Sequence, residues 1–159
     1  MDAGPLSTTD ASGLSPAALL ERGIAELAAD RPAAAEPLLQ QALAREPGLV
    51  AAFRRLQEAQ ARRGELTERC VTGSGDAAMA ACERALLPGA RDEFRLLARM
   101  FDLAILAADR PAAQEFLRQA SALRPQAPAL RFMQQALERR YGTTSARYSN
   151  LPTQAGRWR

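Results

Sequence analysis

The sequence predicts an all-α protein, and its composition and the spacing of its hydrophobic residues are the two observations that indicate this class. Of 159 residues, 35 are alanine and 22 are leucine, which both favour helices, whereas valine and isoleucine together number four. Apolar residues recur at the i, i+3, i+4 spacing of helices along most of the chain. The length and the globular composition, 47% hydrophobic and 25% charged, are typical of one domain.

Four segments carry the apolar face of an amphipathic helix, namely 16–29, 49–63, 92–108 and 129–140. Ser15 supplies a capping hydroxyl and Pro16 a favourable first position, so the first helix has a clear start. Gly64 is a typical C-terminal stop, so we expect the second of these helices to end there.

Further helices are expected between these, because residues 28–45 recur as 107–124 with eleven of eighteen positions identical at an offset of 79. Both copies contain the turn Asp-Arg-Pro, followed by small, large and small residues on one helical face and then a proline that ends the helix. The positions are Ala35, Leu39, Ala42 and Pro47 in the first copy, Ala113, Leu117, Ala120 and Pro125 in the second, and Ala78, Cys82, Ala85 and Pro88 between them.

Helix pairs with this glycine, alanine, leucine, alanine and proline spacing resemble tetratricopeptide repeats, whose period is about 34 residues. The resemblance covers about residues 16–142 and implies an α-solenoid of three degenerate antiparallel hairpins with a capping helix, an unrelated helical bundle being the alternative. Ala35 and Ala78 are 43 residues apart, so we place the excess in a turn-rich insertion at 67–76. The helical domain then spans 15–142, between a flexible arm at 1–14 and a tail at 143–159.

In this family the first helices line a concave groove that binds a peptide or a partner helix. The resemblance places in that groove Leu20, Ile24, Leu27, Arg54, Glu58, Arg62, Arg95, Arg99, Leu103 and Leu106. Such a groove suits a partner with apolar and acidic residues, because arginine pairs bidentately with carboxylates. The alternative is a solvated face on which these arginines pair with Glu58 along the helix. The lysine and asparagine clamp of the chaperone-binding members is absent, since the chain has no lysine and its only asparagine is Asn150.

The C-terminal tail is a second candidate contact. Residues 139–159 contain five arginines and no acid, whereas residues 1–138 contain 16 arginines and 18 acids. Arginine and aromatic residues are frequent in binding hot spots. The candidate residues are Tyr141, Arg147, Tyr148, Arg157, Trp158 and Arg159. The alternatives are a fold-back into the chain's own groove, contact with nucleic acid, and a solubilising disordered end.

The missing residue types exclude several kinds of chemistry. The chain has no histidine, and all 21 basic residues are arginine, so histidine-based catalysis, histidine metal sites and lysine Schiff bases cannot occur. We therefore expect no catalytic residue, no cofactor and no metal. Cys82 is expected to be a small core residue and Cys70 to lie in a loop, while a disulfide between them is the alternative and would need an oxidising compartment.

These observations predict a non-catalytic protein–protein interaction adaptor or assembly subunit that binds its partner in the groove, with the tail as a second contact. The alternatives are a bacterial secretion or assembly chaperone, nucleic-acid binding through the tail, and a regulatory subunit of an enzyme. The N-terminal residues lack the pattern of a secretory signal and no run is long enough to span a bilayer, so we expect a cytoplasmic protein without membrane insertion. No small-molecule substrate is expected, and self-association is left open.

Overall fold

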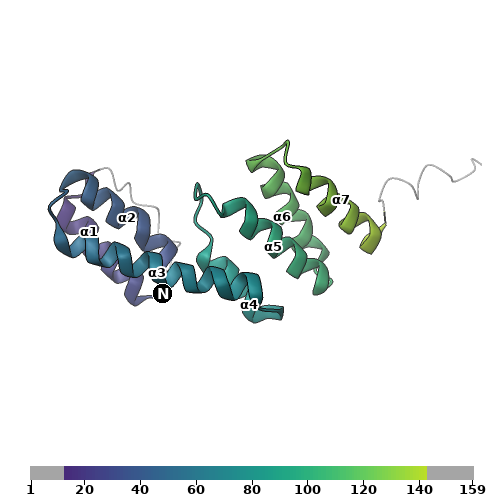
Figure 1. Cartoon of the computed structure of the whole chain (residues 1–159), viewed down its shortest axis with the longest axis horizontal. Coiled ribbons are helices and arrows are strands. Elements are labelled where there is room, and N and C mark those ends of the chain that lie inside the picture. The colour runs from purple at the N-terminus through teal and green to yellow at the C-terminus, as the bar shows by residue number, and fades with distance from the viewer. Residues whose placement is uncertain (1–12, 143–159) are drawn as a thin grey trace, which may run out of the picture. The chain divides into compact units, whose positions relative to one another are not determined.

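The computed structural model describes residues 13–142 and confirms the all-α class. The chain forms two units, which we call unit 1, up to Leu96, and unit 2, from Leu97 onward. Within the described residues there are seven helices and no strand (Figure 1). The helices are α1 Pro16–Ala28, α2 Pro32–Arg45, α3 Val50–Thr72, α4 Gly75–Ala85, α5 Glu93–Leu106, α6 Arg110–Leu123 and α7 Pro128–Tyr141.

The helix starts follow the sequence signals closely. The Ser15 hydroxyl accepts a hydrogen bond from the Ala18 N–H at 3.2 Å, which confirms the predicted cap of α1. The second helix of each predicted pair also forms, and its first small residue, Ala35, Ala78 or Ala113, is at most 2% exposed. Apolar periodicity therefore locates these helices, and a side-chain cap marks the start of α1.

The helix end expected at Gly64 is wrong, because α3 continues to Thr72. A Cβ atom at Gly64 would meet nothing within 4 Å, so this glycine only faces solvent in mid-helix. Beyond it, Leu66 and Cys70 are buried and prolong the apolar face of the helix. Their burial offsets the cost of about 1 kcal/mol for a glycine inside a helix. Most of the insertion at 67–76 is therefore helix, and Cys70 lies on α3 rather than in a loop.

The core of unit 1 is made where successive helices pack side by side. α2 contacts α1 and α3, and α3 contacts α4. Two buried clusters fill the space between the first three helices, one of Leu27, Ala35, Leu39 and Ala59 and one of Leu19, Ala42 and Ala52. Gly23 on α1 lies so close to α2 that a Cβ there would be 2.7 Å from the Leu39 Cγ. Small residues thus permit the close helix approach that the spacing predicted.

The two Asp-Arg-Pro turns place their left-handed residue one position apart in the shared sequence. The left-handed residue is Asp30 in the first turn, with φ 59°, but Ala108 in the second, with φ 57°. Asp109 is consequently the N-cap of α6, where its carboxylate accepts a hydrogen bond from the Ala112 N–H at 3.1 Å. In the first turn Arg31 occupies the cap position. Structurally equivalent residues are therefore 78 apart, although the identical letters are 79 apart.

Unit 2 contains α6 and α7, which pack against each other, and the part of α5 that follows Leu96. Leu97 and Phe101 of α5 are at most 2% exposed and are the largest fully buried side chains of unit 2. The Arg110 guanidinium lies over the Tyr141 ring at 5.5 Å from its centroid, which joins the start of α6 to the end of α7 by a cation–π contact.

Glu115 on α6 gives unit 2 a carboxylate that should stay ionised in acid. It accepts hydrogen bonds from Arg118 and Gln119, and these bonds, with that from Arg118 first, lower the pKa of Glu115 from 4.5 to about 2. Since the folded pKa is depressed, this stabilising contribution is complete above the unfolded pKa and is lost as the pH falls toward 2. A ¹³C-carboxyl NMR titration should find this value, and Glu115→Gln should reduce the acid sensitivity of unfolding. A titration midpoint near 4.5 would contradict the expectation.

Candidate functional site

The exposed side of α1 and α3 in unit 1 is the candidate functional site. α1 contacts α3 directly (Figure 1). We define the α1–α3 surface by Ile24, Arg55, Glu58 and Arg62. Ala52 and Ala59 turn one face of α3 into the core, and Arg55 and Arg62, three residues after each of them, lie at the edge of that face. The surface is tied together where Arg62 Nη1 donates to the Leu27 carbonyl of α1 at 3.1 Å.

Glu58 stands between two arginines on this surface. Arg55 Nη1 lies 2.8 Å from one carboxylate oxygen and Arg62 Nη2 lies 2.6 Å from the other. The hydrogen bond from Arg55, together with the charge of Arg62, lowers the pKa of Glu58 against the effect of desolvation. Glu58 consequently remains ionised and orders both guanidinium groups on α3, while Ile24 on α1 is 36% exposed. This is the pairing along the helix that was the alternative to a binding groove, with Arg55 in place of Arg54.

Several predicted groove residues lie elsewhere. Leu27 is 3% exposed and belongs to a core cluster, and Leu20 is half-buried against the same cluster. Arg54 is exposed on α3, about 200° around the helix from buried Ala52, so it points away from the core and lies one turn before Glu58 on the same side of the helix. The sequence reasoning missed Arg55, although its position three residues before Glu58 and seven before Arg62 was a usable signal.

The predicted residues of α5 also divide between surface and core. Arg95 and Leu106 are exposed, Arg99 is half-buried, and Leu103 is only 4% exposed, so Leu103 is not available to a partner. Asp102 lies one turn from Arg99 and Leu106 on the same helix. Partial burial raises the pKa of Asp102, while the charge of Arg99 acts in the opposite direction.

Of the predicted tail residues, only Tyr141 lies in the described part of the chain. It is half-buried at the end of α7 beneath Arg110. The remaining candidates lie outside the described residues, namely Arg147, Tyr148, Arg157, Trp158 and Arg159.

A second group of charged residues lies deeper in unit 1. Arg63 Nε is 2.7 Å from a carboxylate oxygen of Glu36 on α2, and Arg63 Nη1 is 3.1 Å from Asp92, just before α5. Glu36 is 3% exposed, so Arg63, rather than water, balances its negative charge. Burial acts to lower the pKa of Arg63, but hydrogen bonds and charges from Glu36 and Asp92 raise it overall. The group lines a cavity of about 520 Å³ and joins α2, α3 and the segment before α5.

Between residues 13 and 142, no group of three or more histidine, cysteine or acidic side chains is arranged to hold a metal ion. In the same residues, no helix is both long and apolar enough to cross a bilayer. What the α1–α3 surface can do chemically is present fixed guanidinium groups and an apolar side chain to another molecule.

Comparisons with protein-family models, with curated proteins and with solved structures found no significant match to this chain. The tetratricopeptide resemblance therefore rests on the residues of the chain alone.

Proposed function

We propose that the chain is a non-catalytic, tetratricopeptide-like interaction subunit that binds a peptide or helix of a partner protein on the α1–α3 surface. Two features of unit 1 support this. Short turns join successive helices into hairpins, and like helices of successive hairpins touch, α1 with α3 and α2 with α4. Such contacts are expected of stacked repeats, whose first helices share one open face.

The observation that carries the proposal is the fixed array of Arg55, Glu58 and Arg62 on α3, with Ile24 exposed on the neighbouring helix α1. Glu58 takes one N–H of Arg55, and a guanidinium has five such donors in a rigid plane. A partner carboxylate can therefore add to an arginine whose side chain is already ordered, which lowers the entropic cost of binding. Ile24 offers an apolar anchor point on α1, so we propose a partner segment with acidic and apolar residues.

The chain offers a matched pair of variants for the test. Arg55→Glu reverses a charge on the α1–α3 surface, and Arg22→Glu makes the same substitution at an exposed arginine of α1 that lies about 160° around that helix from Ile24. In a quantitative pull-down of partner proteins from lysate of the native host, Arg55→Glu should reduce capture at least tenfold. Arg22→Glu should change it less than twofold. Equal losses for both variants would mean that capture depends on net charge, and undiminished capture by the Arg55→Glu protein would refute the proposed surface.

The tail belongs to the proposal as a second contact, and a chain ending at residue 142 tests it in the same pull-down. A loss of affinity in this truncation with the Arg55→Glu effect intact would assign separate roles to the tail and the surface. A client that is unstable when purified alone would favour the chaperone reading over a stable adaptor complex. Material that is nucleic acid and dissociates as salt rises would contradict both readings.

A further inference from the structure

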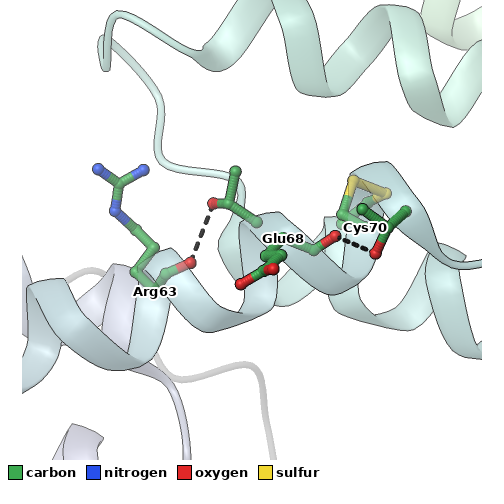
Figure 2. Close-up of a disulfide and its surroundings, with 6 residues drawn as sticks. Arg63, Glu68 and Cys70 are labelled. Atoms are coloured by element: carbon green, nitrogen blue, oxygen red, sulfur yellow. Dashed lines mark hydrogen bonds between the residues drawn. A yellow bond between two sulfur atoms is a disulfide. The ribbon is translucent and has the colours of Figure 1, made fainter.

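The two cysteines of the chain are joined in a disulfide inside unit 1 (Figure 2). Cys70 lies on the last turns of α3 and Cys82 lies on α4, and their Cα atoms are 4.7 Å apart. Both residues are 0% exposed. The bond therefore joins the two helices through the interior, at the part of α3 that extends beyond the expected end at Gly64.

Few large buried apolar side chains stabilise this part of unit 1 besides the disulfide. The buried residues around the bridge are one leucine and several alanines, namely Leu66, Ala78, Ala81 and Ala85. By contrast, the contacts of α1 with α2 and α3 bury three leucines, Leu19, Leu27 and Leu39. Because the hydrophobic contribution grows with the apolar area removed from water, α4 gains much less from packing on α3. A covalent bond is the usual supplement where a core is too small.

Two side-chain hydrogen bonds also mark the extension of α3. The Thr67 and Thr72 hydroxyls each donate to the carbonyl four residues earlier, of Arg63 and Glu68, at 2.9 Å (Figure 2). Such bonds can form as long as the helix itself persists, and they do not attach α3 to α4. The disulfide is thus the one covalent cross-link between these helices apart from the peptide chain itself, which joins them through Gly73 and Ser74.

We propose that the Cys70–Cys82 disulfide is a structural bond formed by thiol–disulfide exchange, and that the chain works in an oxidising compartment as a substrate of a dithiol–disulfide oxidant. One cysteine thiolate attacks the disulfide of the oxidant, forming a mixed disulfide and releasing one oxidant sulfur as a thiolate. The second cysteine thiolate then attacks the first cysteine's sulfur and releases the other oxidant sulfur. Two electrons and two protons pass from the cysteines to the oxidant, which ends as a dithiol.

Burial assigns the bond a structural rather than a switching role. Exchange requires a thiolate to reach a sulfur atom in line with the S–S bond, and both sulfurs belong to residues without solvent exposure. The bond must therefore form before α4 settles on α3, and it can be reduced only when the two helices separate. This inference opposes the cytoplasmic location predicted from the sequence, and it does not use the α1–α3 surface.

The first test follows the thiols of the full-length protein. After equilibration in an oxidising glutathione buffer, N-ethylmaleimide should add to neither cysteine, whether the protein is native or unfolded in urea. After reduction in urea it should add to both, as read from the intact mass. Dithiothreitol should reduce the native protein at least tenfold more slowly than a disulfide in the unfolded chain. Two alkylated thiols in the equilibrated protein would overturn the proposal.

The second test measures what the bond stabilises. Reduction should lower the urea midpoint and speed amide hydrogen exchange at least tenfold over residues 66–85, with less than a twofold change over residues 19–42. The double variant Cys70→Ala/Cys82→Ala has no disulfide, so the reductant should change neither its urea midpoint nor its amide exchange. It therefore controls for other effects of the reductant. If that variant fails to fold, the reduced unchanged protein still gives the comparison. Equal midpoints and equal exchange in the two redox forms would overturn the structural role.

The compartment is tested in the cells of origin by acid quenching followed by alkylation. The chain should be recovered with no free thiol. Recovery of the chain with both cysteines alkylated would place it in a reducing compartment and overturn this part of the proposal, whatever the pull-down of the Arg55 variant shows.

Discussion

Replacing Arg63 by methionine should lower the free energy of unfolding by about 3–5 kcal/mol, because it leaves a buried carboxylate without its partner. Glu36 is 3% exposed and lies 2.7 Å from Arg63 Nε, so no solvent takes over the role of the guanidinium. The same substitution releases Asp92, which Arg63 holds at 3.1 Å just before α5. Urea denaturation followed by circular dichroism measures the loss.

Two further variants show whether the lost pairing is the cause. Arg54→Met removes an exposed arginine of the same helix and should change the free energy of unfolding by less than about 0.5 kcal/mol. Combining Arg63→Met with Glu36→Leu removes both buried charges and should recover most of the loss. A loss for Arg63→Met no larger than that for Arg54→Met would show that Glu36 is solvated or paired in another way.

Leu39→Ala should cost about 2–5 kcal/mol of unfolding free energy, because it opens a cavity at the centre of unit 1. Leu39 is 0% exposed and belongs to the cluster shared by α1, α2 and α3. Its side chain also fills the space directly over Gly23, where a Cβ would lie 2.7 Å from its Cγ. Urea denaturation of both proteins measures this loss as a shift of the midpoint at an unchanged m-value.

The effect of Gly23→Ala should change sign with the residue at position 39. In the unchanged protein the added methyl group collides with Leu39 and should destabilise by about 1–3 kcal/mol, which exceeds the gain of about 1 kcal/mol in helix propensity. In the Leu39→Ala protein the same methyl group enters the cavity and should stabilise. Gly64→Ala is the matched control, since a Cβ there meets nothing within 4 Å, and it should stabilise by about 1 kcal/mol. The same sign for Gly23→Ala in both backgrounds would contradict the packing described.

The helices could be predicted from the sequence because apolar periodicity and capping residues act locally. Helix ends that depend on distant contacts could not. Gly64 has the propensity of a stop, yet Leu66 and Cys70 find buried places beyond it and the helix continues. The repeated Asp-Arg-Pro turn shows the same limit, because identical letters place the left-handed residue at Asp30 in one copy and before Asp109 in the other.

The candidate site was predictable as a region and not residue by residue. The sequence placed the groove on α1, α3 and α5, and of the residues it named, Ile24, Glu58 and Arg62 belong to the α1–α3 surface defined above. A helical period alone does not show which edge of a helix meets its neighbour, so Leu27 was expected on the surface although it is buried. The disulfide was only an alternative, because its formation depended on α3 continuing past Gly64 to carry Cys70 to α4.

Site-specific photo-crosslinking in the native host tests the central claim most directly, because it maps contact without removing any interaction. A benzoylphenylalanine at position 24 lies on the α1–α3 surface, and one at position 57 lies at an exposed place on α3 that is about 100–160° around the helix from Arg55, Glu58 and Arg62. We predict a discrete adduct with another protein from position 24 and none from position 57. An adduct of equal yield from both positions, or from position 57 alone, would show that the α1–α3 surface is not where this chain binds its partner.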